Sequence, residues 1–328
     1  VIVVTYGEGS EINKSNKWKV FHVSKSGGPL VRWRRYAKAL REHGSGADVV
    51  YAFSSVSSGV PLWMAKLKKP KKILRLGGDF FWERYTDHGG RKGLRDWYSS
   101  SSYGRSAMHM LLRKFDHMVF STRFQEKLYE EHYSKLPSHS VIENAVPSLS
   151  MVDSPSFEAR PHSPFRLLFM GRLVGFKNLP ALIESMKQMQ NVGLLIVGDG
   201  PMKSKLQKLV GRLDLEQRVI FAAPIQGEEK KEVFDAHDLL IIPSVTEISP
   251  NVALEAVSSG LPVLLTKETG LSEELTKGMV VRDLSTVEKI AEAVNEVRNS
   301  DLKVAISSIS ERGWEKVADE HMDLFKSL

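Results

Sequence analysis

The second half of the chain alternates short apolar segments with helix-like segments, and this alternation limits the possible folds more than any other feature of the sequence. The apolar segments are rich in Leu, Ile and Val, and they cover residues 165–171, 193–200, 218–223, 238–244 and 261–266. Helices are predicted at 180–189, at 201–213, from about Glu228, and at 251–260, where Gly260 closes the helix. Buried strands separated by helices form a parallel sheet that is covered on both faces. We therefore predict a doubly wound α/β domain in this half.

The first half shows the same alternation less regularly. Strands are predicted at residues 1–6, 47–54, 71–78 and 117–122, with amphipathic helices between some of them. Residues 141–165 are rich in Pro and Ser, which is typical of a linker. Because a chain of 328 residues exceeds the usual size of one hydrophobic core, we predict two α/β domains, over 1–150 and 151–312, with the boundary near residue 150.

Composition excludes several classes of protein. The chain has no cysteine, so it can form neither a disulfide framework nor a thiolate zinc site, and no cysteine can act as a nucleophile. The ten histidines show no spacing typical of a metal site, so no metal is expected. No apolar run is long enough to cross a bilayer, and the sequence opens on a short strand-like run that differs from a secretory signal. A cytoplasmic protein is the simplest interpretation.

Charge is divided unevenly between the two halves. Residues 1–150 contain 25 Lys and Arg against 13 Asp and Glu, a net charge of +12, whereas residues 151–328 have a net charge of −5. A basic surface attracts anionic lipid, nucleic acid or a phosphorylated acceptor through the same long-range field, and a solvated basic face is the simpler alternative. Residues 66–75 follow Trp63 and Met64, which suits either a lysine-rich loop or contact with acidic phospholipid headgroups.

Two basic residues follow the first strand of the second half. Gly171 and Arg172 stand at the carboxyl end of the strand at 165–171, and Lys177 comes a few residues later. Open α/β sheets bind their ligands at this end of the strands. An Arg with a nearby Lys can neutralise a diphosphate as it leaves during sugar transfer. A pair of solvated loop charges is the alternative.

The second motif is a glycine-rich turn. Gly198, Asp199 and Gly200 close the segment at 193–200. Two glycines around one residue indicate a tight turn that passes close to another group. Either a ligand-binding turn or a plain connection from strand to helix explains the pattern.

The third motif combines two glutamates with the start of a helix. Glu247 lies in the loop after the strand at 238–244, and Glu255 lies eight residues later on the next helix. Backbone N–H groups at the start of that helix would point at an anion such as a phosphate. The residues there are Ser249, Pro250, Asn251 and Val252. An ionised Glu255 can accept hydrogen bonds from both hydroxyls of a ribose, and Glu247 could contact the sugar. For either Glu alone, an ordinary surface glutamate is the alternative.

Together, the three motifs resemble the pattern of the retaining family-four glycosyltransferases. That pattern is a strand, then GR with a Lys a few residues later, then VGDGP, then two Glu separated by seven residues. The resemblance covers residues 141–328 and includes WEKVA at 314–318, which is similar to the family's C-terminal helix. It implies the GT-B fold, in which two doubly wound Rossmann-like domains face a cleft. It also implies that the last helix, over residues 313–328, crosses back to the N-terminal domain.

The resemblance assigns roles to the residues of the motifs. Arg172 and Lys177 are implied to bind the donor diphosphate, Glu255 the ribose, and Glu247 the transferred sugar. The SPN sequence at 249–251 is similar to the loop that supplies backbone donors to the phosphates. No metal or other cofactor is expected, since the two basic residues and a helix N-terminus can balance the diphosphate.

The first half departs from the family pattern in two ways. Many members carry a His near the transferring sugar, whereas this chain has LRLGGDFFWERY from residue 74. Asp79 is the candidate for a catalytic residue that faces the cleft, and a turn Asp beside Gly77 and Gly78 is the alternative. The family's first strand, Gly-rich loop and helix do not precede the strand at 1–6. We therefore expect an N-terminal domain that lacks its first strand and helix.

These observations predict a retaining hexosyltransferase that moves a sugar from a UDP- or GDP-sugar to an acceptor. The basic first half favours a lipid-linked or polysaccharide precursor of the cell envelope, with peripheral contact to the inner face of the membrane. A nucleotide-sugar-binding protein without turnover is the alternative that an incomplete first domain suggests. A GT-B epimerase should lack the two glutamates around SPN, and a phosphorylase would need a cofactor lysine that the sequence does not reveal. Nucleic-acid binding is disfavoured, because no recognition motif accompanies the basic half.

Overall fold

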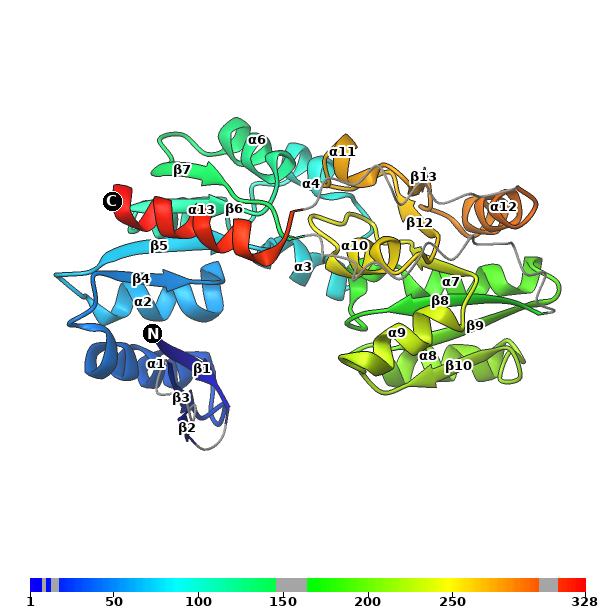
Figure 1. Cartoon of the computed structure of the whole chain (residues 1–328), viewed down its shortest axis with the longest axis horizontal. Coiled ribbons are helices and arrows are strands. Elements are labelled where there is room, and N and C mark those ends of the chain that lie inside the picture. Colours follow the sequence, from blue (N-terminus) through cyan, green and yellow to red (C-terminus); the bar gives the residue numbers. More distant parts are fainter. Residues whose placement is uncertain (8–9, 13–17, 146–163, 301–311) are drawn as a thin grey trace. The chain divides into compact units, whose positions relative to one another are not determined.

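The computed structural model describes residues 1–7, 10–12, 18–145, 164–300 and 312–328 (Figure 1). The chain divides into two compact units. The first unit comprises Val1–Phe81, Ser101–Glu143 and Glu320–Leu328, and the second comprises Trp82–Ser100 and Asn144–Asp319. The predicted boundary near residue 150, and most of the predicted linker, lie outside the described residues.

A six-stranded parallel sheet forms the centre of the second unit. Its strands are β8 (Phe165–Met170), β9 (Val192–Val197), β10 (Val219–Ala222), β11 (Leu239–Ile242), β12 (Val263–Thr266) and β13 (Val280–Arg282). The five predicted strands are confirmed, and β13 is an addition. The order across the sheet is β10-β9-β8-β11-β12-β13, so the chain builds outward from β8 and then starts again at β11. The reversal between β8 and β11 is the topological switch point of a doubly wound sheet, where such sheets bind ligands.

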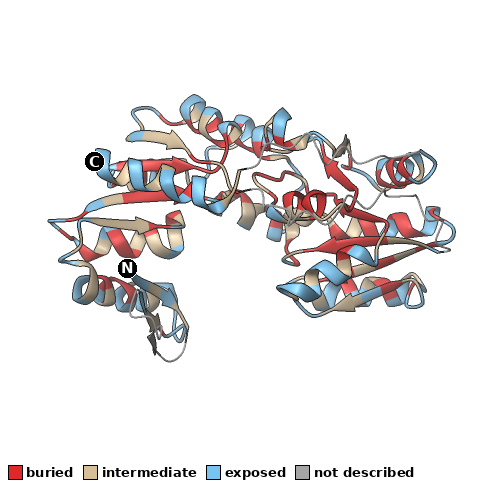
Figure 2. Ribbon diagram, viewed as in Figure 1, coloured by how far each residue is buried: buried red, intermediate tan, exposed pale blue. Residues whose placement is uncertain are grey.

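Helices cover both faces of this sheet, as predicted. They are α7 (Leu179–Ser185), α8 (Lys203–Arg212), α9 (Glu228–Asp235), α10 (Asn251–Ser258), α11 (Glu273–Thr276) and α12 (Val287–Arg298). One core contains Ile183 of α7, Leu206 of α8 and Val294 of α12. The other core contains Phe234 of α9 and Leu254 of α10. Figure 2 shows buried residues along the strands of this unit and on its helices, which is the arrangement expected for a sheet between two helical layers.

Gly260 ends α10, as predicted. Its φ angle is 81°, a conformation that glycine adopts without strain. The Gly260 N–H donates to the carbonyl of Val257, and the Leu261 N–H donates to that of Ala256. These two bonds form a Schellman motif, which satisfies the last carbonyls of the helix and turns the chain toward β12.

The described strands of the first unit form two sheets. The smaller contains β1 (Ile2–Tyr6), β2 (Ser10–Ile12) and β3 (Lys19–Val23), and the larger is parallel and contains β4 (Val49–Ala52), β5 (Lys71–Leu76), β6 (His117–Phe120) and β7 (Ser138–Val141). The helices of this unit include α1 (Pro29–Gly44), α2 (Val60–Ala65), α5 (Arg105–Leu112) and α6 (Arg123–His132). The four predicted strands are confirmed, while β2, β3 and β7 were not predicted. No helix that the structure describes is long and apolar enough to span a membrane.

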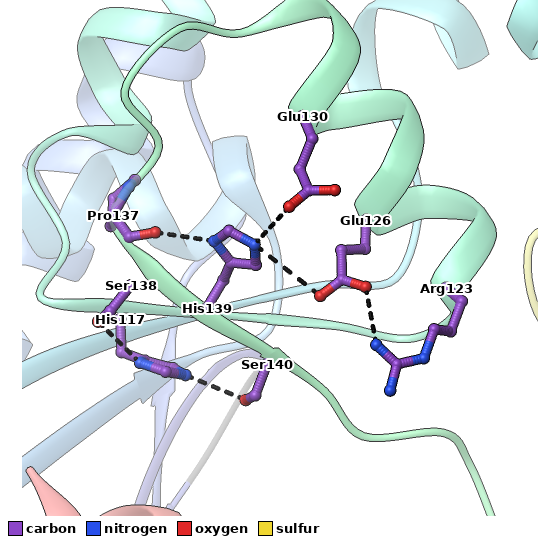
Figure 3. A network of polar contacts seen from close by, with 8 residues as sticks. All are labelled: His117, Arg123, Glu126, Glu130, Pro137, Ser138, His139 and Ser140. Carbon is purple, nitrogen blue, oxygen red and sulfur yellow. Dashed lines mark hydrogen bonds and ion pairs between the residues drawn. The ribbon is translucent and has the colours of Figure 1, made fainter.

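Polar contacts hold β7 at the edge of the larger sheet (Figure 3). His117 of β6 lies between the hydroxyls of Ser138 and Ser140 of β7, at 3.0 Å from each. Burial is the main cause that lowers the pKa of His117, so the fold favours the neutral ring, which two hydroxyls can satisfy. On the other side of β7, His139 Nε2 lies 3.3 Å from Glu130 Oε1 of α6. These contacts explain how a polar strand joins the sheet.

The chain passes between the units more often than the sequence indicated. Helix α3 (Phe80–Asp87) begins in the first unit, but Trp82–Ser100, which includes α4 (Leu94–Ser100), groups with the second unit. The predicted domain over 1–150 did not separate this segment. Helix α13 (Trp314–Ser327) is also divided between the units: it begins in the second unit, and its residues from Glu320 onward group with the first. There His321 Nε2 lies 2.9 Å from Tyr51 Oη.

Candidate functional site

The predicted motif residues of the second half gather at the switch point of the six-stranded sheet. Gly171 and Arg172 follow β8, and Glu247 lies in the loop after β11, the strand that pairs with β8. Parallel strands end on one edge of the sheet, so both loops lie on that edge. Sequence spacing and sheet order therefore agree on the position of the candidate site.

The two glycine-containing turns pack directly against each other. The Gly171 N–H donates to the Val197 carbonyl at 3.0 Å, and the Leu173 N–H donates to the Asp199 carbonyl at 2.9 Å. A β-carbon at Gly198 would lie 2.0 Å from the carbonyl oxygen of Gly171, and one at Gly200 would lie 2.5 Å from that of Leu173. The glycines are therefore needed for contact between the turns, which fixes the position of the turn that carries Arg172.

Charged side chains at these turns differ in their contacts. Arg172 is exposed, and its side chain forms no hydrogen bond or ion pair with any other residue that the structure describes. Asp199 is also exposed, but its carboxylate accepts from the N–H of Gly200 at 2.9 Å and lies 3.8 Å from Lys203 Nζ. Arg172 is thus available to an anionic ligand, while Asp199 stabilises its own turn.

Lys177 and Glu247 form an ion pair inside the site. Lys177 Nζ lies 2.6 Å from Glu247 Oε2, and the two side chains are 13% and 9% exposed. The Ser244 hydroxyl donates to the same carboxylate oxygen at 2.7 Å. The backbone of Glu247 is held as well, because its N–H donates to the Glu268 carbonyl at 2.8 Å and its carbonyl accepts from Gly270 at 2.7 Å. Hydrogen bonds thus hold both the side chain and the backbone of Glu247.

The start of α10 has the form that the sequence predicted. The helix begins at Asn251, and the residue at its N-cap, Pro250, makes no side-chain capping hydrogen bond. Asn144 donates hydrogen bonds to the Ser249 hydroxyl at 3.1 Å and to the side-chain oxygen of Asn251 at 2.7 Å. Val252 is partly exposed in the first turn. Such an end attracts anions, because its N–H groups and the helix dipole favour negative charge.

Glu255 has a partner that the sequence did not indicate. It lies on α10 and forms an ion pair with Lys230 of α9, and the two side chains are 30% and 27% exposed. The pair spans 25 positions of the chain, so no local spacing reveals it. Like Lys177 beside Glu247 and Lys203 beside Asp199, Lys230 is thus a cation in contact with a predicted acidic site residue.

Asp79 does not have the exposure expected of a residue that faces a cleft. Its side chain is 2% exposed, and the Tyr129 hydroxyl donates to its carboxylate at 2.9 Å. Both residues belong to the first unit. This burial favours the structural alternative, in which Asp79 is a hydrogen-bond acceptor beside Gly77 and Gly78. Among the described residues, no group of three or more His, Cys, Asp or Glu side chains is placed to hold a metal ion.

Comparison with protein families gives a match in the second half of the chain. Residues 153–310 match the family described as Glycosyl transferases group 1. The match covers just under half of the chain. The switch-point loops and α10, which carry the candidate site, all lie within the matched residues.

Two curated proteins that are similar to part of this chain are glycosyltransferases. An uncharacterized glycosyltransferase of Methanocaldococcus jannaschii is 36% identical over 110 residues, which are 33% of this chain and 28% of that protein. LpsD, a lipopolysaccharide core biosynthesis glycosyltransferase of Rhizobium meliloti, is 29% identical over 174 residues, 50% of each chain. The match thus spans half or less of the length of each of these two relatives.

A solved structure extends the likeness to the whole chain. HepE of Anabaena, whose structure was determined in complex with UDP and glucose, matches with a TM-score of 0.73. The match covers 100% of this chain and 92% of that chain at 16% sequence identity. At this identity the likeness shows the fold alone. The chain has the GT-B fold, which confirms the predicted fold class.

Proposed function

We propose that this chain is a retaining, family-four glycosyltransferase that transfers a hexose from a UDP- or GDP-sugar to an acceptor. The observation that carries the proposal is the grouping, at one switch point, of an exposed arginine, a Lys177–Glu247 ion pair and the uncapped start of α10. Each of these can interact with a different part of a nucleotide sugar. The UDP bound to HepE, a protein of the same fold, supports a nucleotide ligand.

The proposed reaction depends on the departure of the diphosphate. As the bond between the anomeric carbon and the diphosphate oxygen breaks, negative charge develops on that oxygen. Arg172, Lys177 and the N–H groups at the start of α10 would stabilise this charge. The acceptor hydroxyl then bonds to the anomeric carbon on the face that the diphosphate leaves, its proton passes to a phosphate oxygen, and the configuration is retained. No protein nucleophile, metal or other cofactor is part of this proposal.

The two glutamates would recognise the neutral parts of the donor. Glu255 would accept hydrogen bonds from both ribose hydroxyls, in place of some of its contact with Lys230. Glu247, beside Lys177, would accept hydrogen bonds from hydroxyls of the transferred sugar. Hydrogen bonds to a charged acceptor are worth about 1.5–3 kcal/mol each, so loss of either carboxylate should be measurable.

The acceptor in this proposal is a lipid-linked or polysaccharide precursor. The name of LpsD, which assigns that relative to lipopolysaccharide core biosynthesis, supports a cell-envelope product. The net charge of +12 over residues 1–150 supports an anionic acceptor, or peripheral contact with an anionic membrane surface from the cytoplasmic side.

Calorimetric titration with UDP, GDP and ADP tests the proposed donor site. We expect one of the three to bind, and Glu255→Ala and Arg172→Ala each to weaken that binding about tenfold or more, because each removes a charge-assisted contact. Hydrolysis of the matching nucleotide sugar, followed by product analysis, then tests turnover.

Exposed residues of the same types provide the controls. Glu292→Ala on α12 and Arg212→Ala at the end of α8 remove the same side chains elsewhere in the second unit and should leave binding unchanged. Binding without hydrolysis would favour the alternative, a nucleotide-sugar-binding protein without turnover. Failure of all three nucleotides to bind would contradict both functions.

Lys230→Gln is expected to weaken nucleotide binding about two- to fivefold. Lys230 holds the Glu255 carboxylate and adds positive charge near the nucleotide, but both side chains are partly exposed, and such charges contribute about 1 kcal/mol or less. The same titration measures the change. Lys231→Gln is the matched control, because Lys231 lies next along α9 and is 61% exposed. Equal affinities of the two variants would show that Lys230 has no part in binding.

A further inference from the structure

The segment Trp82–Ser100 contacts both loops that carry the Lys177–Glu247 pair. It groups with the second unit, although the residues on either side of it in the sequence belong to the first. It contains most of α3 and all of α4. None of its residues is among the predicted site residues, so its contacts with the two loops add a new element to the candidate site.

The first contact is with the loop that contains Lys177. The Gly175 N–H donates to the Asp87 carboxylate at 2.9 Å. The backbones touch here, because a β-carbon at Gly175 would lie 2.3 Å from the Thr86 carbonyl oxygen. The next residue, Phe176, has its ring 5.4 Å from that of Trp82. Lys177 Nζ in turn lies 4.9 Å from the centre of the Phe176 ring. The position of Lys177 therefore depends on residues of α3.

The second contact is with the loop that contains Glu247. The Leu94 N–H, at the start of α4, donates to the Thr246 hydroxyl at 2.9 Å, and this hydrogen bond is buried. Thr246 is 1% exposed and directly precedes Glu247. If the hydroxyl is removed, a buried N–H loses its acceptor, which is more costly than the loss of an exposed hydrogen bond.

The two loops are also bonded to each other. The Val245 N–H donates to the Phe176 carbonyl at 2.8 Å, and the Lys177–Glu247 pair follows immediately, at 2.6 Å. The loops and the segment thus form a closed set of contacts around the ion pair.

We infer that Asp87 and Thr246 are positioning residues that hold Lys177 and Glu247 in their working geometry. The inference rests on the proposed function for the role of the pair, but the contacts themselves do not. A displacement of about 1 Å in a catalytic group can reduce the rate about a hundredfold. The segment Trp82–Ser100 would therefore influence the transfer rate without touching the donor.

Thr246→Val tests the second contact, because valine keeps the shape of threonine and lacks the acceptor. We expect a drop of about ten- to a hundredfold in kcat for donor hydrolysis, with nucleotide affinity changed less than about threefold. Thr246→Ser restores the hydroxyl and should recover most of the rate. Asp87→Ala should behave like Thr246→Val, whereas Asp87→Asn, which keeps a side-chain oxygen, should recover.

Thr86→Val is the matched control, since Thr86 is buried in the same segment and its hydroxyl donates within α3, to the carbonyl of Glu83. Hydrogen exchange over residues 171–178 provides a readout that needs no activity. Exchange should be faster than in the wild type for Thr246→Val and Asp87→Ala, and unchanged for Thr86→Val. If Thr246→Val and Asp87→Ala both keep the wild-type rate of donor hydrolysis and the wild-type rate of hydrogen exchange, the inference is wrong. If the wild type neither binds a nucleotide nor hydrolyses a donor, the proposed function fails separately, and exchange still decides whether these residues position the pair.

Discussion

Replacing Gly198 with alanine is expected to lower the free energy of unfolding of the second unit by about 3–5 kcal/mol. The β-carbon would lie 2.0 Å from the carbonyl oxygen of Gly171, and φ at Gly198 is 150°, where alanine is strained. The opposing turn cannot move away freely, because backbone hydrogen bonds join it to Val197 and Asp199. Denaturant unfolding followed by circular dichroism measures the loss. Nucleotide binding should fall as well, since the displaced turn carries Arg172.

Gly193→Ala is the matched control for this prediction. Gly193 lies in β9 of the same sheet, and the one atom of the described residues within 4 Å of a β-carbon there would be the Arg218 carbonyl oxygen, 4.0 Å away. Alanine also loses less chain entropy on folding than glycine, so this variant should be as stable as the wild type or slightly more stable. If Gly198→Ala unfolds at the same denaturant concentration as the control, the two turns are not packed as the structure describes.

The strands of the second unit could be predicted because the sheet is buried on both faces. Leu167 and Leu168 are neighbours in β8, yet they belong to opposite cores. The buried positions of such a strand must be apolar on both faces, as they are over Leu167–Met170, and this leaves a continuous signal in the sequence. The strands that were not predicted lack this constraint. In β7 and β13 the side chains are partly or fully exposed, so polar residues are tolerated and pairing with a neighbouring strand decides the structure.

The candidate site could be predicted only where its residues have a local signature. Arg172 follows a buried strand, and Asn251 begins a helix after SP, so their positions follow from the elements around them. The side-chain pairings do not. Lys177 and Glu247 are 70 positions apart, and they meet because β11 returns to lie beside β8. That return is a property of the whole sheet and has no short-range signal.

The burial of Asp79 was equally hard to predict from the sequence. A Gly-Gly-Asp sequence after a strand has the same appearance whether the carboxylate is exposed or buried. Here the carboxylate accepts a hydrogen bond from Tyr129, which lies 50 positions later on α6. Contacts made by Trp82–Ser100 with the loops of the second unit are equally long-range, and only the folded structure brings them together.

Replacing Lys177 with methionine is expected to reduce donor turnover about 10²–10³-fold, on the proposed function, because a cation that meets the developing diphosphate charge is removed. It should also lower the free energy of unfolding by about 3 kcal/mol. Glu247 is 7% exposed, and it would keep the Ser244 hydroxyl but lose its counter-charge. Donor hydrolysis and denaturant unfolding measure the two effects, and Lys187→Met, at an exposed lysine of the same unit, is the control.

The double variant Lys177→Met/Glu247→Gln separates the two effects. Glutamine keeps the shape of Glu247 and can still accept from Ser244, so the double variant contains no unpaired buried charge and should be more stable than Lys177→Met alone. Turnover should not recover, because neither the cation nor the carboxylate is restored. If turnover recovers with stability, Lys177 maintains the fold of the loop and has no direct part in the reaction. If Lys177→Met retains turnover within about threefold of the wild type, its proposed role at the diphosphate is wrong.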